Sequence, residues 1–180
     1  MCILTLVLLL TSTVTASDQY TTFNDGTVKF DYPSWKPFPG EAVAQMKRQT
    51  GAELQKYKRY ILDLQMFISP KEEAAFFISK TRADNPPAAQ DLFTERQNVH
   101  REALKAGYLT KVNTLEILKS SAGSMVVEDV DRNDGQRART VKIVVSSFIY
   151  EVTLAVSQKS NYEKFRPYLD HAVDTFKRVK

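Results

Sequence analysis

Apolar and polar residues alternate between residues 27 and 32 of the chain. Every second residue of segment 27–32 is apolar and the residues between are charged or polar, which predicts a strand with one buried face. A shorter strand is predicted at 20–23. Asp25-Gly26 lies between the two segments, and a glycine at this step supplies the positive φ that tight hairpin turns need. The pattern therefore predicts an antiparallel hairpin.

Two later segments change to helical spacing. In segment 41–57, with Gly51 as a weak point, the recurring positions are Val43, Met46, Thr50, Leu54 and Tyr57. In the second helix Asn85 is the predicted N-cap, Pro86 the first helical residue and Gly107 the stop signal. Its predicted inner stripe consists of Ala89, Leu92, Phe93, Arg96, Val99, Ala103 and Ala106.

The remaining segments are extended, apart from a final helix. Strands are predicted at 60–68, 74–79, 110–118, 124–131, 139–145 and 148–156, and in the first of them Leu62, Leu64, Met66 and Ile68 share one face. Ser160 and Glu163 have the spacing of a capping box before a helical stripe that ends at Phe176. Pro167 inside that stripe predicts a kink or a new helix start. Residues 17–180 are therefore expected to form one α+β domain.

The first sixteen residues follow a different pattern. An apolar run up to Leu10 breaks into small residues and ends in Val14-Thr15-Ala16, which is typical of a cleaved signal peptide, although no Lys or Arg precedes the run. The run is shorter than the roughly 20 residues that a membrane span needs. We expect a signal peptide at 1–16, a secreted or periplasmic protein, and no transmembrane anchor after cleavage. Cys2 is the only cysteine, so the mature chain is expected to have no disulfide.

The charge composition of the chain limits the kinds of partner that we expect. The net charge is +4 and basic residues do not form a run, which is typical of a solubilising surface that could also contact an anionic envelope surface. No nucleic-acid-binding motif is recognisable, so nucleic acid is not an expected partner.

Catalytic and metal-binding patterns are not found in the sequence. His100 and His171 are the only histidines, and each is interpreted as a surface or half-buried helix residue. Asp129, Asp131 and Asn133 begin a calcium-loop pattern, but the sixth position lacks the required glycine and the twelfth lacks the required glutamate. The sequence therefore predicts no enzyme, no cofactor and no metal site.

Two groups of residues are candidates for binding a partner. Trp35, with Phe38 nearby, is either an exposed aromatic recognition surface or a plug that seals one end of the core. Arg132, Arg137 and Arg139, together with Lys142, either form a small basic binding patch or balance the acidic residues of the same hairpin. Those acidic residues are Glu128, Asp129, Asp131 and Asp134.

Three segments resemble the PsbP-like superfamily, which includes secreted bacterial DcrB-like and PsbP-related proteins. They are Val28-Lys29-Phe30-Asp31-Tyr32-Pro33-Ser34-Trp35, the late strand from Phe148 to Leu154, and the ending from Phe165 to Phe176. The resemblance implies an antiparallel central sheet flanked by helices, an α/β/α sandwich, with Pro167 as the first residue of the main terminal helix. It implies adaptor or assembly roles rather than catalysis, and no family catalytic residue can be carried over.

Three functional hypotheses follow. The leading one is an exported, non-enzymatic binding or adaptor protein of the cell envelope that contacts another envelope or secreted protein. The alternative is a carrier of a small ligand or metal, with a pocket between sheet and helix. The third is an enzyme whose residues are scattered along the chain. A deep pocket with converging polar groups favours the second or third, and a flat face favours the first.

Overall fold

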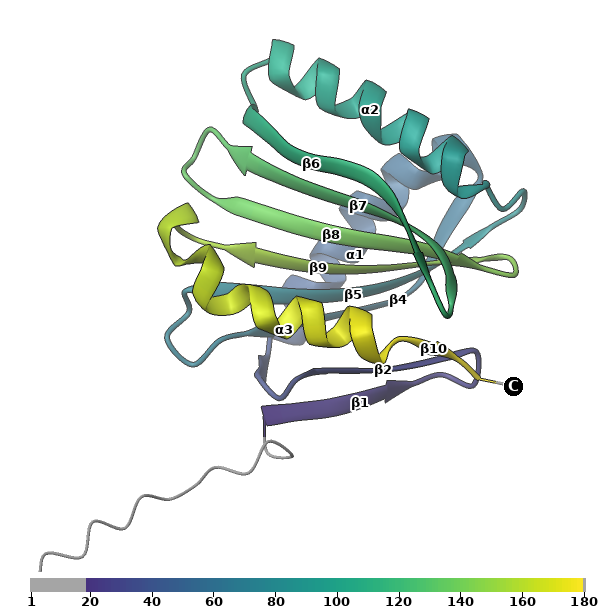
Figure 1. The fold of residues 1–180 in the computed structure, drawn as a ribbon, viewed down its shortest axis with the longest axis horizontal. Helices are drawn as coiled ribbons and strands as arrows, with labels where there is room; N and C mark the ends of the chain where they lie inside the picture. Colours follow the sequence, from purple (N-terminus) through teal and green to yellow (C-terminus); the bar gives the residue numbers. More distant parts are fainter. Residues whose placement is uncertain (1–18, 180) are drawn as a thin grey trace, which may run out of the picture.

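The computed structural model describes residues 19–179, which form two antiparallel sheets and three α-helices (Figure 1). The helices are α1 (Gly40–Leu54), α2 (Ala89–Lys105) and α3 (Tyr162–Thr175). The 3₁₀ turns are η2 (Gln55–Tyr57) and η3 (Lys159–Asn161). The strands are β1 (Tyr20–Asn24), β2 (Val28–Pro33), β3 (Lys36–Pro37), β4 (Arg59–Ile68), β5 (Ala74–Ala83), β6 (Leu109–Ser120), β7 (Gly123–Arg132), β8 (Arg137–Val145), β9 (Phe148–Val156) and β10 (Lys177–Arg178).

The large sheet has the strand order β3-β4-β5-β9-β8-β7-β6 and every neighbouring pair is antiparallel. Strands β6 to β9 follow one another as a meander, and β9 pairs with β5 from the earlier hairpin. The small sheet, in the order β1-β2-β10, closes with the last strand of the chain beside the first hairpin.

One face of the large sheet carries the main hydrophobic core. Helix α3 and the small sheet cover this face, and α3 contributes four fully buried side chains. The central strands contribute residues of one parity, such as Phe76 and Ile78 of β5 and Val152 and Leu154 of β9, because successive strand residues point to opposite faces.

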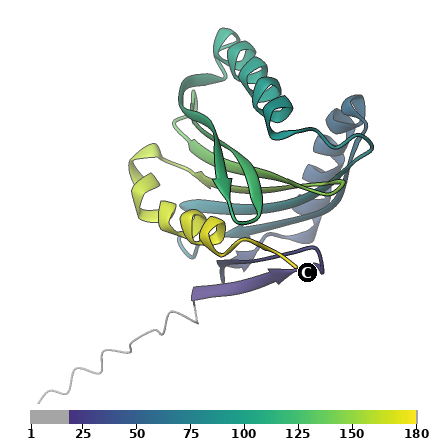
Figure 2. The ribbon, with the colours of Figure 1, turned by 45° about the vertical axis from the view of Figure 1, so that its right-hand side comes forward.

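Helices α1 and α2 cover the opposite face, so the order of layers is helix, sheet, helix (Figures 1 and 2). A smaller cluster lies there, built from Ala83, Leu92, Val126 and Ile149. In contrast to α3, helix α1 has no fully buried residue. No helix among residues 19–179 is long and apolar enough to cross a bilayer. The α+β sandwich expected from the sequence is confirmed.

Three local predictions were wrong. Helix α2 begins at Ala89 rather than at Pro86, because Pro87 disfavours helical geometry at the residue before it. The Ser160–Glu163 capping box does not form, and Glu163 pairs with Arg166 instead. Pro167 does not start a helix; it lies inside the continuous helix α3.

The prediction of which β4 residues share one face of the sheet was also wrong, at Leu62. The register shifts between Ile61 and Asp63, which makes Leu62 the extra residue of a β-bulge and leaves it 44% exposed. The bulge places Ile61 on the same face of the sheet as Leu64, the face on which the apolar–polar alternation of the sequence had predicted Leu62.

Candidate functional site: a groove between two helices and the sheet

A cavity of about 660 Å³ lies between α1, α2 and the large sheet. Met46, Thr50 and Leu54 of α1 form one wall. Leu92, Val99 and Ala103 of α2 form the other wall. We call this cavity the α1–α2 groove. The middle of the stripe predicted for segment 41–57 therefore faces the groove rather than a packed core, whereas Val43 and Tyr57 do not line the groove. This explains why α1 buries no residue.

The floor of the groove is the face of the large sheet between the two helices. The pairing register of its strands places polar side chains in two adjacent rows across this floor. Ser79, Glu151 and Lys142 are directly paired on β5, β9 and β8. Thr153, Thr140 and Glu128 form the neighbouring row on β9, β8 and β7. The Thr140 and Thr153 hydroxyls are hydrogen-bonded at 2.9 Å.

Glu128 is the centre of the charged part of the floor, although only 5% of it is exposed. Its Oε2 accepts a hydrogen bond from Arg96 Nε at 2.7 Å and lies 2.8 Å from His100 Nε2. Its Oε1 lies 3.8 Å from Nζ of Lys142, which also pairs with Glu151. These contacts link α2 to β7, β8 and β9.

The environment of Glu128 determines its ionisation. Burial alone raises the pKa of this carboxyl, but the His100 hydrogen bond and the charges of Lys142 and Arg96 lower the pKa to about 2. Glu128 is therefore a carboxylate at neutral pH, and its charge is compensated inside the protein.

His100 corrects one prediction from the sequence. It is 4% exposed, not a surface or half-buried residue, and its imidazole contacts Glu128. Its Nδ1 is buried and has no hydrogen-bond partner among the described residues. The sequence contained one signal of this buried acid, which is Arg96 in the predicted inner stripe of the helix. A cation on an apolar helix face needs a buried acid opposite it.

Trp35 packs against the core. It is half-buried, and its ring meets Phe76, Phe165 and Tyr168 edge-on at centroid distances of 6.3, 5.8 and 5.1 Å. This geometry is that of the plug. Phe38 is half-buried as well and stacks on Phe77, a groove-lining residue, at 6.5 Å.

The basic residues of the β7–β8 hairpin do not form one patch. Arg132 lines the groove and pairs with Asp134. Arg137 faces α3 instead, where it binds Asp129 through two hydrogen bonds and lies 3.8 Å from the Tyr162 ring centroid.

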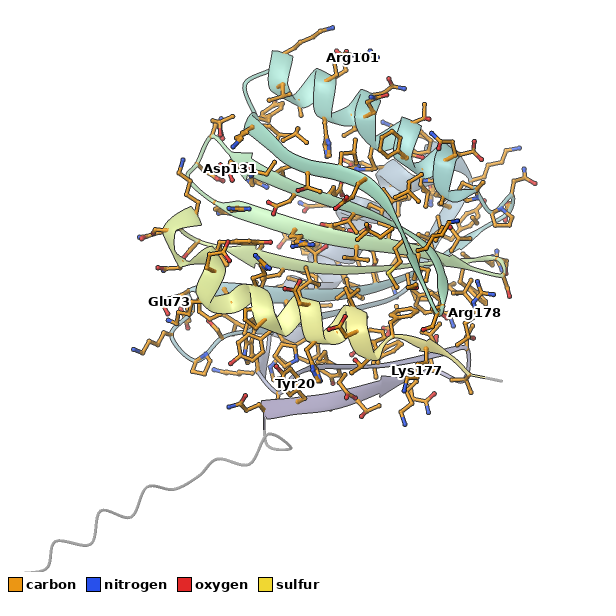
Figure 3. All side chains as sticks on the ribbon, viewed as in Figure 1. Tyr20, Glu73, Arg101, Asp131, Lys177 and Arg178 are labelled. Atoms are coloured by element: carbon orange, nitrogen blue, oxygen red, sulfur yellow. The ribbon has the colours of Figure 1, made fainter. Side chains whose placement is uncertain are left out.

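The rest of this hairpin follows the same division between the two faces. Arg139 faces α3 and approaches Asp170, whereas Lys142 lies in the groove. Figure 3 shows Asp131, the other acid near Arg137, at the end of β7. Within residues 19–179, each of the four basic residues has an acidic neighbour within 4 Å.

The remaining predictions concern metal and the signal peptide. Among residues 19–179 no group of three or more His, Cys, Asp or Glu is placed to hold a metal ion. The predicted signal peptide at 1–16, with Cys2, lies outside the described residues.

Comparison with known proteins adds one finding. No protein-family model and no curated protein sequence matches the chain. Among solved structures, the chain is similar to the solution structure of cyanobacterial PsbP (CyanoP) from Synechocystis sp. PCC 6803. The TM-score is 0.56, the identity is 8%, and the match covers 89% of this chain and 93% of that one. The chain therefore has a PsbP-like fold.

Proposed function

We propose that the protein is an exported, non-enzymatic binding protein that carries a small uncharged amphiphile in the α1–α2 groove. The observation that supports this most is the groove itself, about 660 Å³ with a mostly apolar lining and two rows of polar side chains on the sheet floor. Small-molecule sites are usually concave, mostly apolar and marked by a few converging polar groups. Of the hypotheses drawn from the sequence, this geometry favours the small-ligand carrier over an adaptor that acts through a flat face.

The charges of the floor favour an uncharged ligand. Glu128 and Glu151 carry two negative charges, and Arg96 and Lys142 carry two positive charges that already pair with them. A charged group placed against these four residues would lose its hydration without finding an unpaired counter-charge among them, which is costly in a partly buried site. The hydroxyls of Ser79, Thr140 and Thr153 can instead both donate and accept hydrogen bonds to a neutral polar group.

A pair of dyes tests both parts of this proposal. N-phenylnaphthylamine is neutral, and anilinonaphthalene sulfonate has the same aromatic frame with an added negative charge. We expect the neutral dye to give saturable fluorescence enhancement and to raise the melting temperature, and the sulfonate to bind at least tenfold more weakly. Equal or tighter binding of the sulfonate would overturn the assignment of a neutral ligand.

Substitutions in the groove test whether the neutral dye binds there. Ala155 lies on the groove floor, so Ala155→Phe is expected to fill the groove and reduce binding of the neutral dye at least tenfold. The matched control is Ala52→Phe, because Ala52 is exposed on α1 and does not line the groove. Circular dichroism and melting curves establish that both variants fold. Equal dye affinity in the two variants would place the ligand elsewhere.

A further inference from the structure

The stretch that leads from α1 through η2 into β4 is strongly basic. Residues 47–60 contain five Lys or Arg and one acid, Glu53, an excess equal to the net charge of +4 for the whole chain. Arg59 pairs with Glu95, whereas Lys56 and Lys58 are exposed and have no ion-pair partner among residues 19–179. The positive charges of Lys56 and Lys58 therefore face solvent.

Apolar and aromatic side chains are exposed among these charges. Tyr57 is 57% exposed, Tyr60 is 38% exposed, and Leu62 is turned outward by the β-bulge. We call Lys56, Tyr57, Lys58, Tyr60 and Leu62 the 56–62 patch. Arg82 lies 5.4 Å from the ring centroid of Tyr60 and adds positive charge beside the patch, whereas Arg59, 5.6 Å from the Tyr57 centroid, is already paired with Glu95.

The backbone holds the 56–62 patch in a defined turn. Lys58 has the left-handed conformation with φ of 54°, and its N–H donates to the Gln55 carbonyl. The Lys58 carbonyl accepts from Asp84 N–H at 3.2 Å, and Lys47 Nζ donates to the Leu62 carbonyl at 2.7 Å. The last two of these three contacts tie the turn and the start of β4 to the residue after β5 and to α1, so the exposed side chains project from a fixed frame.

We infer that the 56–62 patch docks the protein on an anionic lipid bilayer. Tyrosine prefers the headgroup region of a membrane, a leucine side chain can enter the acyl boundary, and lysines are attracted by anionic lipids. A bulged edge strand by itself explains why Leu62 is exposed, but not why two exposed tyrosines and two exposed lysines lie within six residues of it. Leu54, Arg59 and Ile61, which are neighbours of the patch residues in the chain, line the groove, so an amphiphile leaving the membrane would enter at this end.

Vesicle flotation tests this inference with the full mature chain. We expect binding to vesicles of phosphatidylcholine mixed with phosphatidylglycerol and at least tenfold weaker binding to phosphatidylcholine alone. Each lysine near an anionic surface changes the partition coefficient about fivefold, so Lys56→Gln/Lys58→Gln is expected to lower it about 25-fold. The matched control is Lys111→Gln/Lys119→Gln, which removes the same charge from exposed positions of β6 and should change it less than fivefold.

A fluorescence measurement distinguishes insertion from loose attraction. Tryptophan emission of Tyr57→Trp should shift to shorter wavelength with the mixed vesicles and be quenched by brominated lipid. Tyr108→Trp, at an exposed position beyond the end of α2, should show neither effect. Equal losses in the two lysine pairs, or no shift at position 57, would overturn the inference. Binding of soluble polyglutamate through the same lysines without binding to vesicles would also overturn it, in favour of an acidic protein.

The result of the vesicle-binding test does not depend on whether the groove binds the proposed ligand. The lysine variants change no groove-lining residue and are expected to bind N-phenylnaphthylamine as the parent protein does. Loss of vesicle binding with intact dye binding therefore concerns the membrane inference alone.

Discussion

At the scale of single residues, backbone conformation distinguishes glycines that look equivalent in the sequence. Gly26 has φ of +80° in the β1–β2 turn, where Asp25 Oδ1 accepts from the backbone N–H groups of Thr27 and Val28. Gly51 lies inside α1 with helical geometry. A Cβ added at either glycine would meet no atom within 4 Å, so packing does not separate the two positions.

We therefore predict opposite effects of the same substitution at these positions. Gly51→Ala should raise the free energy of unfolding by about 1 kcal/mol, because alanine restricts the unfolded chain and favours the helix. Gly26→Ala should lower it by about 1 kcal/mol or more, because alanine is strained at positive φ. Urea denaturation of the two variants measures both changes. Destabilisation by Gly51→Ala would show that the glycine in α1 has a role other than helix formation.

At the scale of elements, α1 and α3 cover opposite faces of one sheet but are held differently. Helix α3 buries Tyr162, Phe165, Leu169 and Ala172, and it stays continuous although Pro167 removes one backbone hydrogen bond. Helix α1 buries no residue because its apolar stripe lines the open groove. Local stability should follow this difference, since burial of apolar surface is the main source of helix stability in proteins.

Hydrogen exchange measures this difference directly. We predict that the amides of α1 exchange through local opening at least tenfold faster than those of α3, after correction for intrinsic rates. N-phenylnaphthylamine should slow exchange in α1 and leave α3 unchanged, because α1 lines the groove and α3 covers the opposite face of the sheet. Equal protection of the two helices without the dye would contradict the prediction.

At the scale of the whole molecule, one buried and one half-buried carboxylate connect its layers. Glu128 joins α2 to the large sheet. Asp25 joins the β1–β2 hairpin to the same sheet, accepting from Lys80 Nζ at 2.7 Å and the Tyr150 hydroxyl at 2.8 Å. Burial alone raises the pKa of Asp25, but the Lys80 and backbone hydrogen bonds lower it to about 2.

Stability is therefore expected to fall in acid. A carboxyl whose pKa is lower in the folded state contributes its full stabilisation above the unfolded pKa and loses it as the pH falls through the folded one. For Glu128 this interval runs from 4.5 down to about 2, and the contribution lost across it is about 3 kcal/mol. For Asp25 the interval runs from 3.8 down to about 2.

Urea denaturation at a series of pH values tests this dependence. Glu128→Gln should be less stable at neutral pH by about 3 kcal/mol, because it leaves buried cations uncompensated. Its stability should also fall less between pH 5 and pH 2 than that of the parent protein. Glu116→Gln, at an exposed position of β6, is the control and should keep the parent's acid dependence. An unchanged acid slope in Glu128→Gln would contradict the role assigned to this carboxyl.

The sequence by itself determined most of the secondary structure. Strand β9 has the predicted bounds, the Gly26 hairpin forms, and the stripes of α2 and α3 face the sheet, because periodicity and turn chemistry act over a few residues. The errors lie where local signals compete: Pro87 delays α2, and the bulge at Leu62 exchanges the faces of neighbouring residues.

The groove and its floor were decided only by tertiary structure. Glu128, Lys142 and Glu151 stand on three different strands, and Arg96 and His100 on a helix, and only Glu128 and Lys142, which belong to one hairpin, are related by their positions along the chain. Long-range register places the first three on one face, and the packing of α2 over that face brings the other two within hydrogen-bonding distance of Glu128. Charged residues at such positions look like solvated surface in the sequence, because their burial depends on what another part of the chain places above them.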